Sequence, residues 1–182
     1  MDPVAPELNP AIMARMVLKS RDQKLGRTQL MKLCYFLQEI ESVPLSYDFR
    51  IFNYGPYDSE VLYYLGTACG NDVLNEETVI YPRSYGYKIT PGPKAQELSD
   101  SLDPELAERI DRITQSFSGD GAGELELKST IVFVDREFDR KQQPGNIDII
   151  ADRVHSIKPH FPLQKVKESV ESMRPYLNSL GF

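Results

Sequence analysis

The sequence predicts a mainly α-helical fold with a small β component, an α+β class in the broad sense. Apolar residues recur every three or four positions over most of the chain, which is typical of helices. Alternating patterns are confined to three short segments, too few for a large sheet. The chain has 182 residues, of which 41% are hydrophobic, so we expect residues 1–182 to form a single compact unit.

Two helices are expected near the start of the chain. Residues 10–20 form the first, with Asn9 as a favourable N-cap. The second runs over residues 28–41. Its apolar positions at helical spacing are Leu30, Leu33, Cys34, Leu37 and Ile40. Because neighbouring aromatic residues widen this surface, we expect the second helix to be buried on most of its circumference.

A strand, a third helix and a hairpin are expected next. They are a strand at 46–52, a turn at 53–56, a helix from Asp58 or Ser59 through Cys69, and hairpin strands at 77–82 and 86–90 around a turn at 83–86. Pro82 cannot donate a ladder hydrogen bond. We therefore expect the hairpin to be small or to lie at an edge.

The second half is expected to be helical. The predicted helices lie at 94–99, at 104–117, after Gly123, from 147 to about 157 with Asn146 as its cap, and at 163–177. Residues 118–123 are glycine-rich and predict a flexible linker. The order helix, helix, strand, helix, hairpin makes residues 10–100 winged-helix-like, with the helical part 104–182 packed on them as a bundle.

Composition excludes several classes of protein. No apolar run exceeds five residues, whereas a membrane span needs about 20. The first residues show neither the basic stretch nor the apolar region of a signal peptide. Together with two cysteines, this predicts a cytoplasmic protein that does not enter a membrane. Lysine plus arginine is 21 and aspartate plus glutamate is 27, and the net charge of −6 argues against a bulk nucleic-acid binder.

The charges are segregated along the chain. Within residues 15–32 one acid faces the basic residues Arg15, Lys19, Arg21, Lys24, Arg27 and Lys32. Residues 97–126 are strongly acidic instead. Two interpretations stay open, solvated helix faces or a basic face for an acidic partner.

The residue types of a catalytic centre are scarce. The glycine-rich linker lacks the lysine and the preceding strand of a phosphate-binding loop. His155 shares a helix face with Asp148 and Asp152, but a metal would need another ligand of fixed geometry. Cys34 and Cys69 lie in apolar stretches, with no histidine nearby in sequence to activate them. We therefore expect no enzymatic activity, no catalytic residue, no cofactor and no metal.

Tyrosine is concentrated in the middle of the chain. The residues are Tyr47, Tyr54, Tyr57, Tyr63, Tyr64, Tyr81, Tyr85 and Tyr87. A tyrosine combines an apolar ring with a hydroxyl that stays hydrated, so it suits both cores and binding faces. Packing in the core and hairpin is one interpretation, and a protein-binding patch around the turn at 53–58 is the other.

Two motifs resemble the SocA-like Panacea domain. Residues 26–37 read Gly-Arg-Thr-Gln-Leu-Met-Lys-Leu-Cys-Tyr-Phe-Leu, similar to the family's helix motif. Residues 52–58 read Phe-Asn-Tyr-Gly-Pro-Tyr-Asp, similar to its Tyr-Gly-Pro turn. Within the family, the Tyr-Lys-Ile-Thr pattern at 87–90 and the Lys-Pro-His connector at 158–160 resemble the YwgA-like branch. The resemblance covers residues 10–100 well and the remainder loosely.

This resemblance implies an interaction role. The family is similar to the antitoxin halves of prokaryotic toxin–antitoxin systems, which bind toxins directly, and SocA delivers its toxin to a protease. We therefore expect a non-enzymatic protein-binding module whose partner is a protein, such as a toxin or a protease component, and a homo-oligomer is compatible with this role. Candidate partner-binding residues are Arg27, Lys32, Tyr54, Tyr57, Tyr63, Tyr64, Arg83 and Tyr85. Candidate structural residues of the motifs are Leu30, Leu33, Tyr35, Gly55 and Pro56.

The alternative is a winged-helix transcription regulator that binds DNA. Two features disfavour it. The link between the second and third helices is about fifteen residues, whereas a helix-turn-helix uses about three or four. The helix that would read the groove, residues 57–69, contains no lysine or arginine, although phosphate contacts dominate DNA affinity.

Overall fold

The computed structural model describes residues 4–82 and 84–179. Within them, eight α-helices and two antiparallel strand pairs confirm a mainly helical fold with a small β component. The chain divides into a first unit, Met1–Phe49 with Tyr57–Gly121, and a second unit, Arg50–Pro56 with Ala122–Phe182. The prediction that the whole chain forms one compact unit stays a prediction.

Helix α2 (Arg27–Glu39) is the centre of the first unit. All eight residues from Leu30 to Leu37 are buried, which confirms the predicted burial of this helix. The ring of Phe36 lies 4.4 Å, centroid to centroid, from that of Phe117 at the end of α5 (Pro104–Phe117). At the start of α2, the Gln29 side chain accepts a hydrogen bond from the Gly26 N–H at 2.8 Å, so the helix begins one residue before its predicted start.

Asn9 does not cap helix α1 (Asn9–Lys19) as predicted, because it is the helix's first residue and its side chain points inward. Its Nδ2 donates to the carbonyl of Pro6 at 3.0 Å, in the short 3₁₀ turn η1 (Pro6–Leu8). Its Oδ1 accepts from the Tyr47 hydroxyl at 2.6 Å. Asn9 therefore connects η1, α1 and the segment around Tyr47 by hydrogen bonds.

Three further helices surround this core. Helix α3 (Ser59–Gly70) has the predicted cap, since the Asp58 carboxylate accepts from the Glu60 N–H at 2.9 Å. Both α4 (Ala95–Asp100) and α5 pack against α1. Residues 104–117 therefore belong to the first unit, whereas the sequence analysis grouped them with the C-terminal helices.

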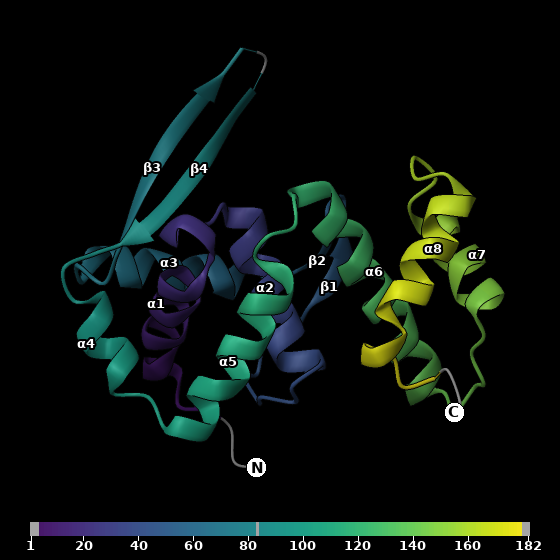
Figure 1. Ribbon diagram of the computed structural model, residues 1–182, viewed down its shortest axis with the longest axis horizontal. Helices are drawn as coiled ribbons and strands as arrows, with labels where there is room; N and C mark the ends of the chain where they lie inside the picture. The colour runs from purple at the N-terminus through teal and green to yellow at the C-terminus, as the bar shows by residue number, and fades with distance from the viewer. Residues whose placement is uncertain (1–3, 83, 180–182) are drawn as a thin grey trace. The chain divides into compact units, whose positions relative to one another are not determined.

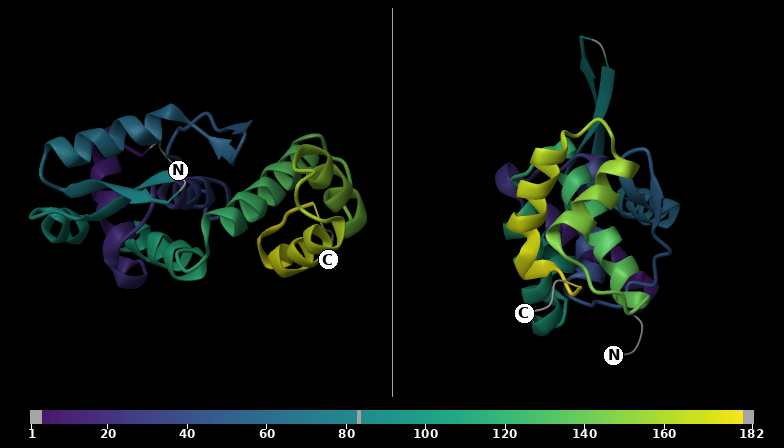
Figure 2. Two further views of the ribbon diagram at one scale, coloured as in Figure 1. Left: turned by 90° about the horizontal axis from the view of Figure 1, so that it is seen from above. Right: turned by 90° about the vertical axis from the view of Figure 1, so that its right-hand side faces the viewer.

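The β3–β4 hairpin is longer than predicted. Strands β3 (Leu74–Tyr81) and β4 (Ser84–Pro91) pair in register over their full length. Pro82 lies in the turn and not in the ladder, so it removes no ladder hydrogen bond. The hairpin extends well beyond the helices of the first unit (Figures 1 and 2). Its base is joined to the core by paired backbone hydrogen bonds between Leu25 and Ile89.

The strand predicted at 46–52 is shorter in the structure. It begins at Arg50 as β1 (Arg50–Phe52), and β2 (Gly55–Tyr57), which the sequence analysis missed, pairs with it. Residues before Arg50 follow a different course, because the backbone N–H and C=O of Tyr47 bond to the side-chain amide of Gln38 at 3.0 and 3.1 Å. The Gln38 side chain thus makes the two backbone hydrogen bonds that a neighbouring strand would make with Tyr47.

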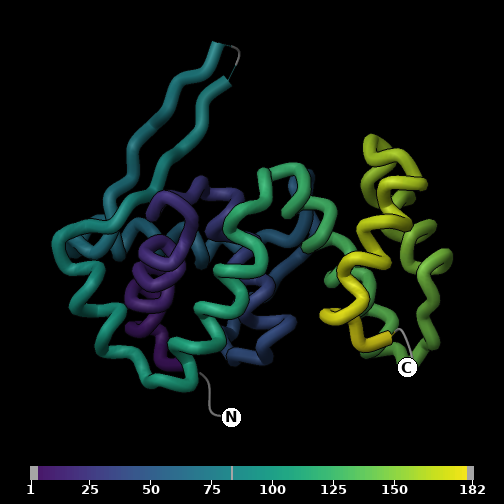
Figure 3. Tube along the Cα trace, in the orientation of Figure 1, coloured from purple at the N-terminus to yellow at the C-terminus, as the bar shows by residue number. Residues whose placement is uncertain are grey.

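Three helices form most of the second unit: α6 (Ala122–Arg140), α7 (Ile147–Ile157) and α8 (Leu163–Met173). Asn146 caps α7 as predicted, accepting from the Ile149 N–H at 2.9 Å. Helices α7 and α8 run side by side after a short connector (Figure 3). The predicted helix to residue 177 ends at Met173, where the 3₁₀ turn η3 (Arg174–Tyr176) carries Pro175, which cannot donate a helical hydrogen bond.

A buried carboxylate fixes the end of this unit. Asp135 on α6 is fully buried and accepts the backbone N–H groups of Asn178 and Ser179, both at 2.9 Å. It also accepts the Ser179 hydroxyl at 2.6 Å and pairs with the guanidinium of the neighbouring Arg136. Four donors on one carboxylate compensate for its removal from water.

We expect Asp135→Ala to lower the free energy of unfolding by about 3 kcal/mol, because it leaves Arg136 buried without this partner. Urea denaturation followed by circular dichroism measures the change. Asp139→Ala is the matched control: its exposed carboxylate accepts one bond from Asn178, and its loss is expected to cost less than about 0.5 kcal/mol. Equal losses in the two variants would contradict the role of Asp135.

Candidate protein-binding site

The structure distributes the candidate contact residues over three places. Arg27 and Tyr85 belong to the hairpin and its base, Tyr63 and Tyr64 lie on α3, and Tyr54 lies in the β1–β2 turn.

The three remaining candidates are Lys32, Tyr57 and Arg83. Lys32 is 2% exposed, so this predicted contact residue is buried inside the first unit and is inaccessible to a partner. Tyr57, at the end of β2, is half-buried. Arg83 lies outside the described residues.

Arg27 holds the base of the hairpin. Its Nε and Nη2 donate to the Glu76 carboxylate on β3 at 2.7 and 2.5 Å. Its guanidinium carbon lies 3.5 Å from the centroid of the Tyr87 ring on β4. The hydrogen bonds to Glu76 raise the pKa of Arg27 above its ordinary value. This predicted contact residue therefore clamps both strands to α2.

Beyond this clamp, one face of the hairpin is apolar and exposed. Cross-strand partners share a face, and Ile80 is paired with Tyr85. Ile80 is 84% exposed and Tyr85 is 67% exposed. The Tyr85 ring also packs edge-to-face on Tyr87, at 5.9 Å between centroids. We call Ile80 and Tyr85 the hairpin tip.

Tyr85 is one of the contact residues predicted from the sequence, whereas Ile80 is not. The sequence analysis placed the turn at 83–86, which leaves Ile80 and Tyr85 without a common register. In the structure β4 begins at Ser84, and the ladder pairs Ile80 directly with Tyr85. Assigning Pro82 to the turn and starting the second strand at Ser84 would therefore have predicted this pair from the sequence.

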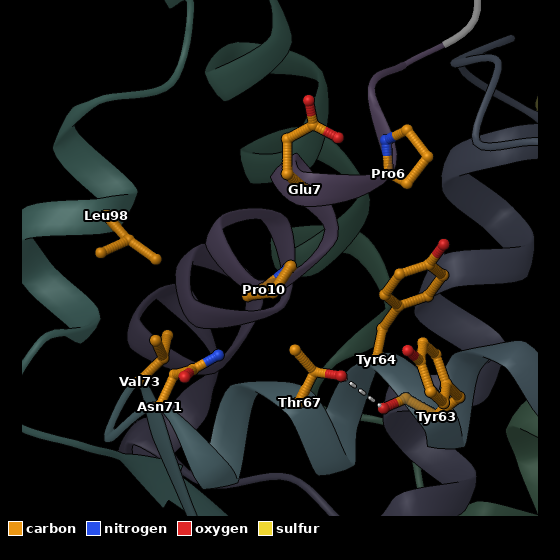
Figure 4. Close-up of a pocket in the computed structure, with 9 residues that line it drawn as sticks. All are labelled: Pro6, Glu7, Pro10, Tyr63, Tyr64, Thr67, Asn71, Val73 and Leu98. Atoms are coloured by element: carbon orange, nitrogen blue, oxygen red, sulfur yellow. Dashed lines mark hydrogen bonds between the residues drawn. The ribbon is translucent and has the colours of Figure 1, made fainter.

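Tyr63 and Tyr64 line a cavity of about 400 Å³ in the first unit, which we call the tyrosine pocket. Figure 4 shows its walls. They come from η1, α1, α3, the turn between α3 and β3, and α4, with the residues Pro6, Glu7, Pro10, Tyr63, Tyr64, Thr67, Asn71, Val73 and Leu98. Tyr63 is 69% exposed, and Pro10 and Val73 are buried beneath the opening.

The walls of this pocket are held in place. The Tyr63 and Tyr64 rings meet edge-to-face at 5.3 Å, and Tyr64 meets the buried Tyr47 ring at 6.3 Å. The Thr67 hydroxyl donates to the Tyr63 carbonyl at 3.1 Å. Desolvation, and then the negative charge of Glu60, raise the pKa of Tyr64, so its phenol stays a neutral hydrogen-bond donor.

The Tyr-Gly-Pro turn has a structural role. Gly55 has a φ of +85°, and a Cβ there would lie 3.0 Å from the Ser129 hydroxyl oxygen and 3.3 Å from the Glu126 carbonyl on α6. Gly55 and Pro56 are buried. Tyr54 beside them is 70% exposed. The turn thus requires glycine at this position and presents one tyrosine to solvent.

The Lys-Pro-His connector reaches the same turn. Lys158 is buried, and its ammonium donates to the carbonyls of Phe52, at 3.0 Å, and Asn53. It also lies 3.0 Å from a carboxylate oxygen of Glu126, with His160 Nε2 at 3.4 Å from the same atom. Hydrogen bonds from the buried Lys158 ammonium therefore join the Lys-Pro-His connector to the Tyr-Gly-Pro turn.

The motif residues of α2 also serve packing. Leu30 and Leu33 are fully buried and Tyr35 is 2% exposed. The Tyr35 ring meets that of Phe49 edge-to-face at 5.1 Å. These three residues occupy the core position that their predicted structural role requires.

The residues considered for catalysis or metal binding have other contacts. Burial raises the pKa of the Cys34 thiol to about 12, and it also raises that of Cys69. Asp148 pairs with Lys167 at 2.6 Å, and His155 Nδ1 lies 2.9 Å from the Phe161 carbonyl. Among the described residues, no group of three or more acidic, cysteine or histidine side chains is arranged to hold a metal.

Folding brings the basic and acidic segments together. Arg15 donates through Nε and Nη2 to both carboxylate oxygens of Asp111, at 2.8 and 2.7 Å. Lys24 pairs with Asp22 at 3.5 Å, and Arg27 is bound to Glu76. With Lys32 buried, four of the six basic residues serve contacts within the chain, whereas Lys19 and Arg21 are exposed, so both interpretations stay open.

No protein-family model and no curated relative matches this chain by sequence. The resemblance to the SocA-like Panacea domain accordingly stays a prediction, carried by the motif residues. In the described part of the chain, no helix has the length and apolarity that crossing a membrane requires.

We expect Gly55→Ala to lower the free energy of unfolding by about 2 kcal/mol or more, because alanine disfavours this φ and its Cβ meets α6. Thermal unfolding measures the effect. Gly66→Ala is the matched control, since Gly66 lies exposed in α3 with no atom near its Cβ position. There alanine is expected to stabilise the protein by up to about 1 kcal/mol. A harmless Gly55→Ala would contradict the close approach.

We expect Cys34 to make the protein alkali-sensitive. Its thiol ionises near its ordinary pKa in the unfolded chain but near 12 in the folded one. Its contribution to stability is therefore full below about pH 9 and is lost as the pH rises toward 12. Between about pH 8 and pH 10, the free energy of unfolding should fall by about 1.4 kcal/mol more than in Cys34→Ala. Urea denaturation at both pH values measures this difference, and parallel declines would refute it.

Proposed function

We propose that the protein is a non-enzymatic, cytoplasmic protein-binding module that holds a partner protein with the hairpin tip. The antitoxins and proteolytic adaptors that its motifs resemble act by binding another protein directly. The observation that carries the proposal is the exposure of Ile80 and Tyr85, 84% and 67%, side by side on one face of a projecting hairpin. Large apolar side chains gathered at an exposed site mark interaction surfaces.

The hairpin is built to present this face. Arg27 and the Leu25–Ile89 bridge fix its base, so fewer degrees of freedom are lost on binding. Among the described residues, β3 and β4 form a sheet of their own, so their outer edges offer backbone groups to an added strand. Apolar side chains and open edges together suit a protein partner.

The charges of the same region support a protein partner over DNA. On the hairpin, Glu76 is bound by Arg27, and Lys88 lies 3.8 Å from Glu77. Cations that would hold phosphates are thus paired with acids. Helix α3 contains no lysine or arginine and carries Glu60 in its first turn. DNA binding by a winged-helix mode remains the second candidate, with less support from these contacts.

The test is copurification with the products of genes adjacent to its own, after co-expression and mass spectrometry. We expect Ile80→Asp to weaken capture of the partner by at least about tenfold, because a carboxylate would be buried in the apolar contact. Since Ile80 is exposed, thermal stability should change by less than about 0.5 kcal/mol. The control is Tyr54→Asp, at a tyrosine that is 70% exposed in the β1–β2 turn.

Full capture by Ile80→Asp, or equal loss in Tyr54→Asp, would overturn the proposal. The DNA alternative has its own measurement. Fluorescence anisotropy with duplex DNA at low and moderate salt should show no submicromolar binding, and salt-dependent binding in that range would favour the regulator instead.

A further inference from the structure

We infer that the tyrosine pocket binds a short extended segment of a partner protein in which an arginine stands next to proline or an aliphatic residue. The inference rests on the proposed function, since it assigns a second contact to the same protein-binding module. It concerns a different surface from the hairpin tip, with different side chains.

The shape of the pocket suits a peptide segment. Its volume of about 400 Å³ holds two or three side chains, and it opens to solvent. Pro10, Val73 and Leu98 give it an apolar floor and far wall (Figure 4). The two tyrosine rings and Pro6 line the opposite side, and aromatic-lined grooves of this kind accept extended, proline-containing chains.

The charge of the pocket selects a cation. Among the described residues that line it, the charged side chain is Glu7, which is exposed at the rim. Glu60 lies close enough to Tyr64 for its charge to act on the phenol, as does that of Glu7. An arginine at this end would place its guanidinium near the Glu7 carboxylate and the tyrosine rings of the pocket, both of which attract it.

The opposite end of the pocket sets the direction of the segment. There Lys94 donates to the carbonyl of Asn71 at 3.2 Å and lies 3.5 Å from the Asp72 carboxylate. Because Lys94 and Asp72 form an ion pair, this end attracts a second cation less than the Glu7 carboxylate does at the other. The arginine is therefore directed to the Glu7 end, and the apolar residues extend toward Leu98.

The pocket is formed before any ligand arrives. Asn9 ties η1 to α1 and to Tyr47, and the Tyr47 ring supports Tyr64 from behind. Walls that need no rearrangement reduce the ordering cost of binding, so a short segment can bind measurably.

The experiment uses the full chain and a capped hexapeptide of proline and leucine with one arginine, and its twin with glutamate in place of arginine. Titration followed by ¹H–¹⁵N NMR should show saturable shifts for Thr67, Asn71 and Leu98 with the arginine peptide, and none with the glutamate peptide. Glu7→Gln should weaken binding about two- to fivefold, and more so at low salt. Tyr63→Ala should weaken it about tenfold.

The matched controls are Glu108→Gln, an exposed acid on α5, and Tyr54→Ala, which should leave the affinity unchanged. No shifts in the pocket at millimolar peptide would overturn the inference, and so would equal binding of the two peptides or an unaffected Glu7→Gln variant. The proposed function is judged separately. If Ile80→Asp still abolishes capture while the peptide fails to bind, the hairpin binds the partner and the pocket does not.

Discussion

The burial of α2 on its whole circumference is the constraint on which the first unit depends. Because eight successive side chains are enclosed, every neighbouring element must offer a complementary apolar surface. Phe117 ends α5 against Phe36, and Phe49 packs on Tyr35. Helices α1, α3 and α5 and the base of β4 all contact α2. The surfaces left for binding are those that face away from this helix, and the hairpin tip and the tyrosine pocket are two of them.

Polar contacts fix the orientation of elements that apolar packing alone would allow to shift. Asn9 and Tyr47 form a buried hydrogen bond that sets η1 against α1, and this geometry shapes the tyrosine pocket. Arg15 bonds to Asp111, 96 residues later in the sequence, so the basic and the acidic segment meet within the first unit. A bidentate pair between partly buried side chains holds α1 to α5 with a defined orientation. Arg15, one of the basic residues considered for a partner's binding face, is thus part of the fold.

Features that depend on contacts between residues close in the sequence, such as the caps of α3 and α7, were predicted correctly. The caps Asp58 and Asn146 each bond within their own first turn, so sequence reasoning found the starts of α3 and α7. The predicted strand residues before Arg50 were wrong, because the side chain of Gln38 bonds to the backbone of Tyr47, nine residues later, where a neighbouring strand would pair. For Gly55, the glycine and the turn were predictable, but the contact with Ser129 was not, since nothing near residue 55 indicates what packs on it. Of the hairpin tip, only Tyr85 was predicted as a contact residue. Its partner Ile80 could be identified only with the correct register of the two strands.

The motifs that carry the family resemblance and the surfaces proposed for binding are built from different residues. Gly55 is enclosed by α6, and Lys158 holds the carbonyls of the same turn, so substitution there disturbs folding before it changes recognition. Ile80 and Tyr85 support no buried contact of comparable extent, because most of each side chain faces solvent. Substitution at the tip therefore alters the binding surface at little cost in stability. In a scaffold divided in this way, packing constrains the motif residues, whereas the residues proposed for binding can be substituted with little loss of stability.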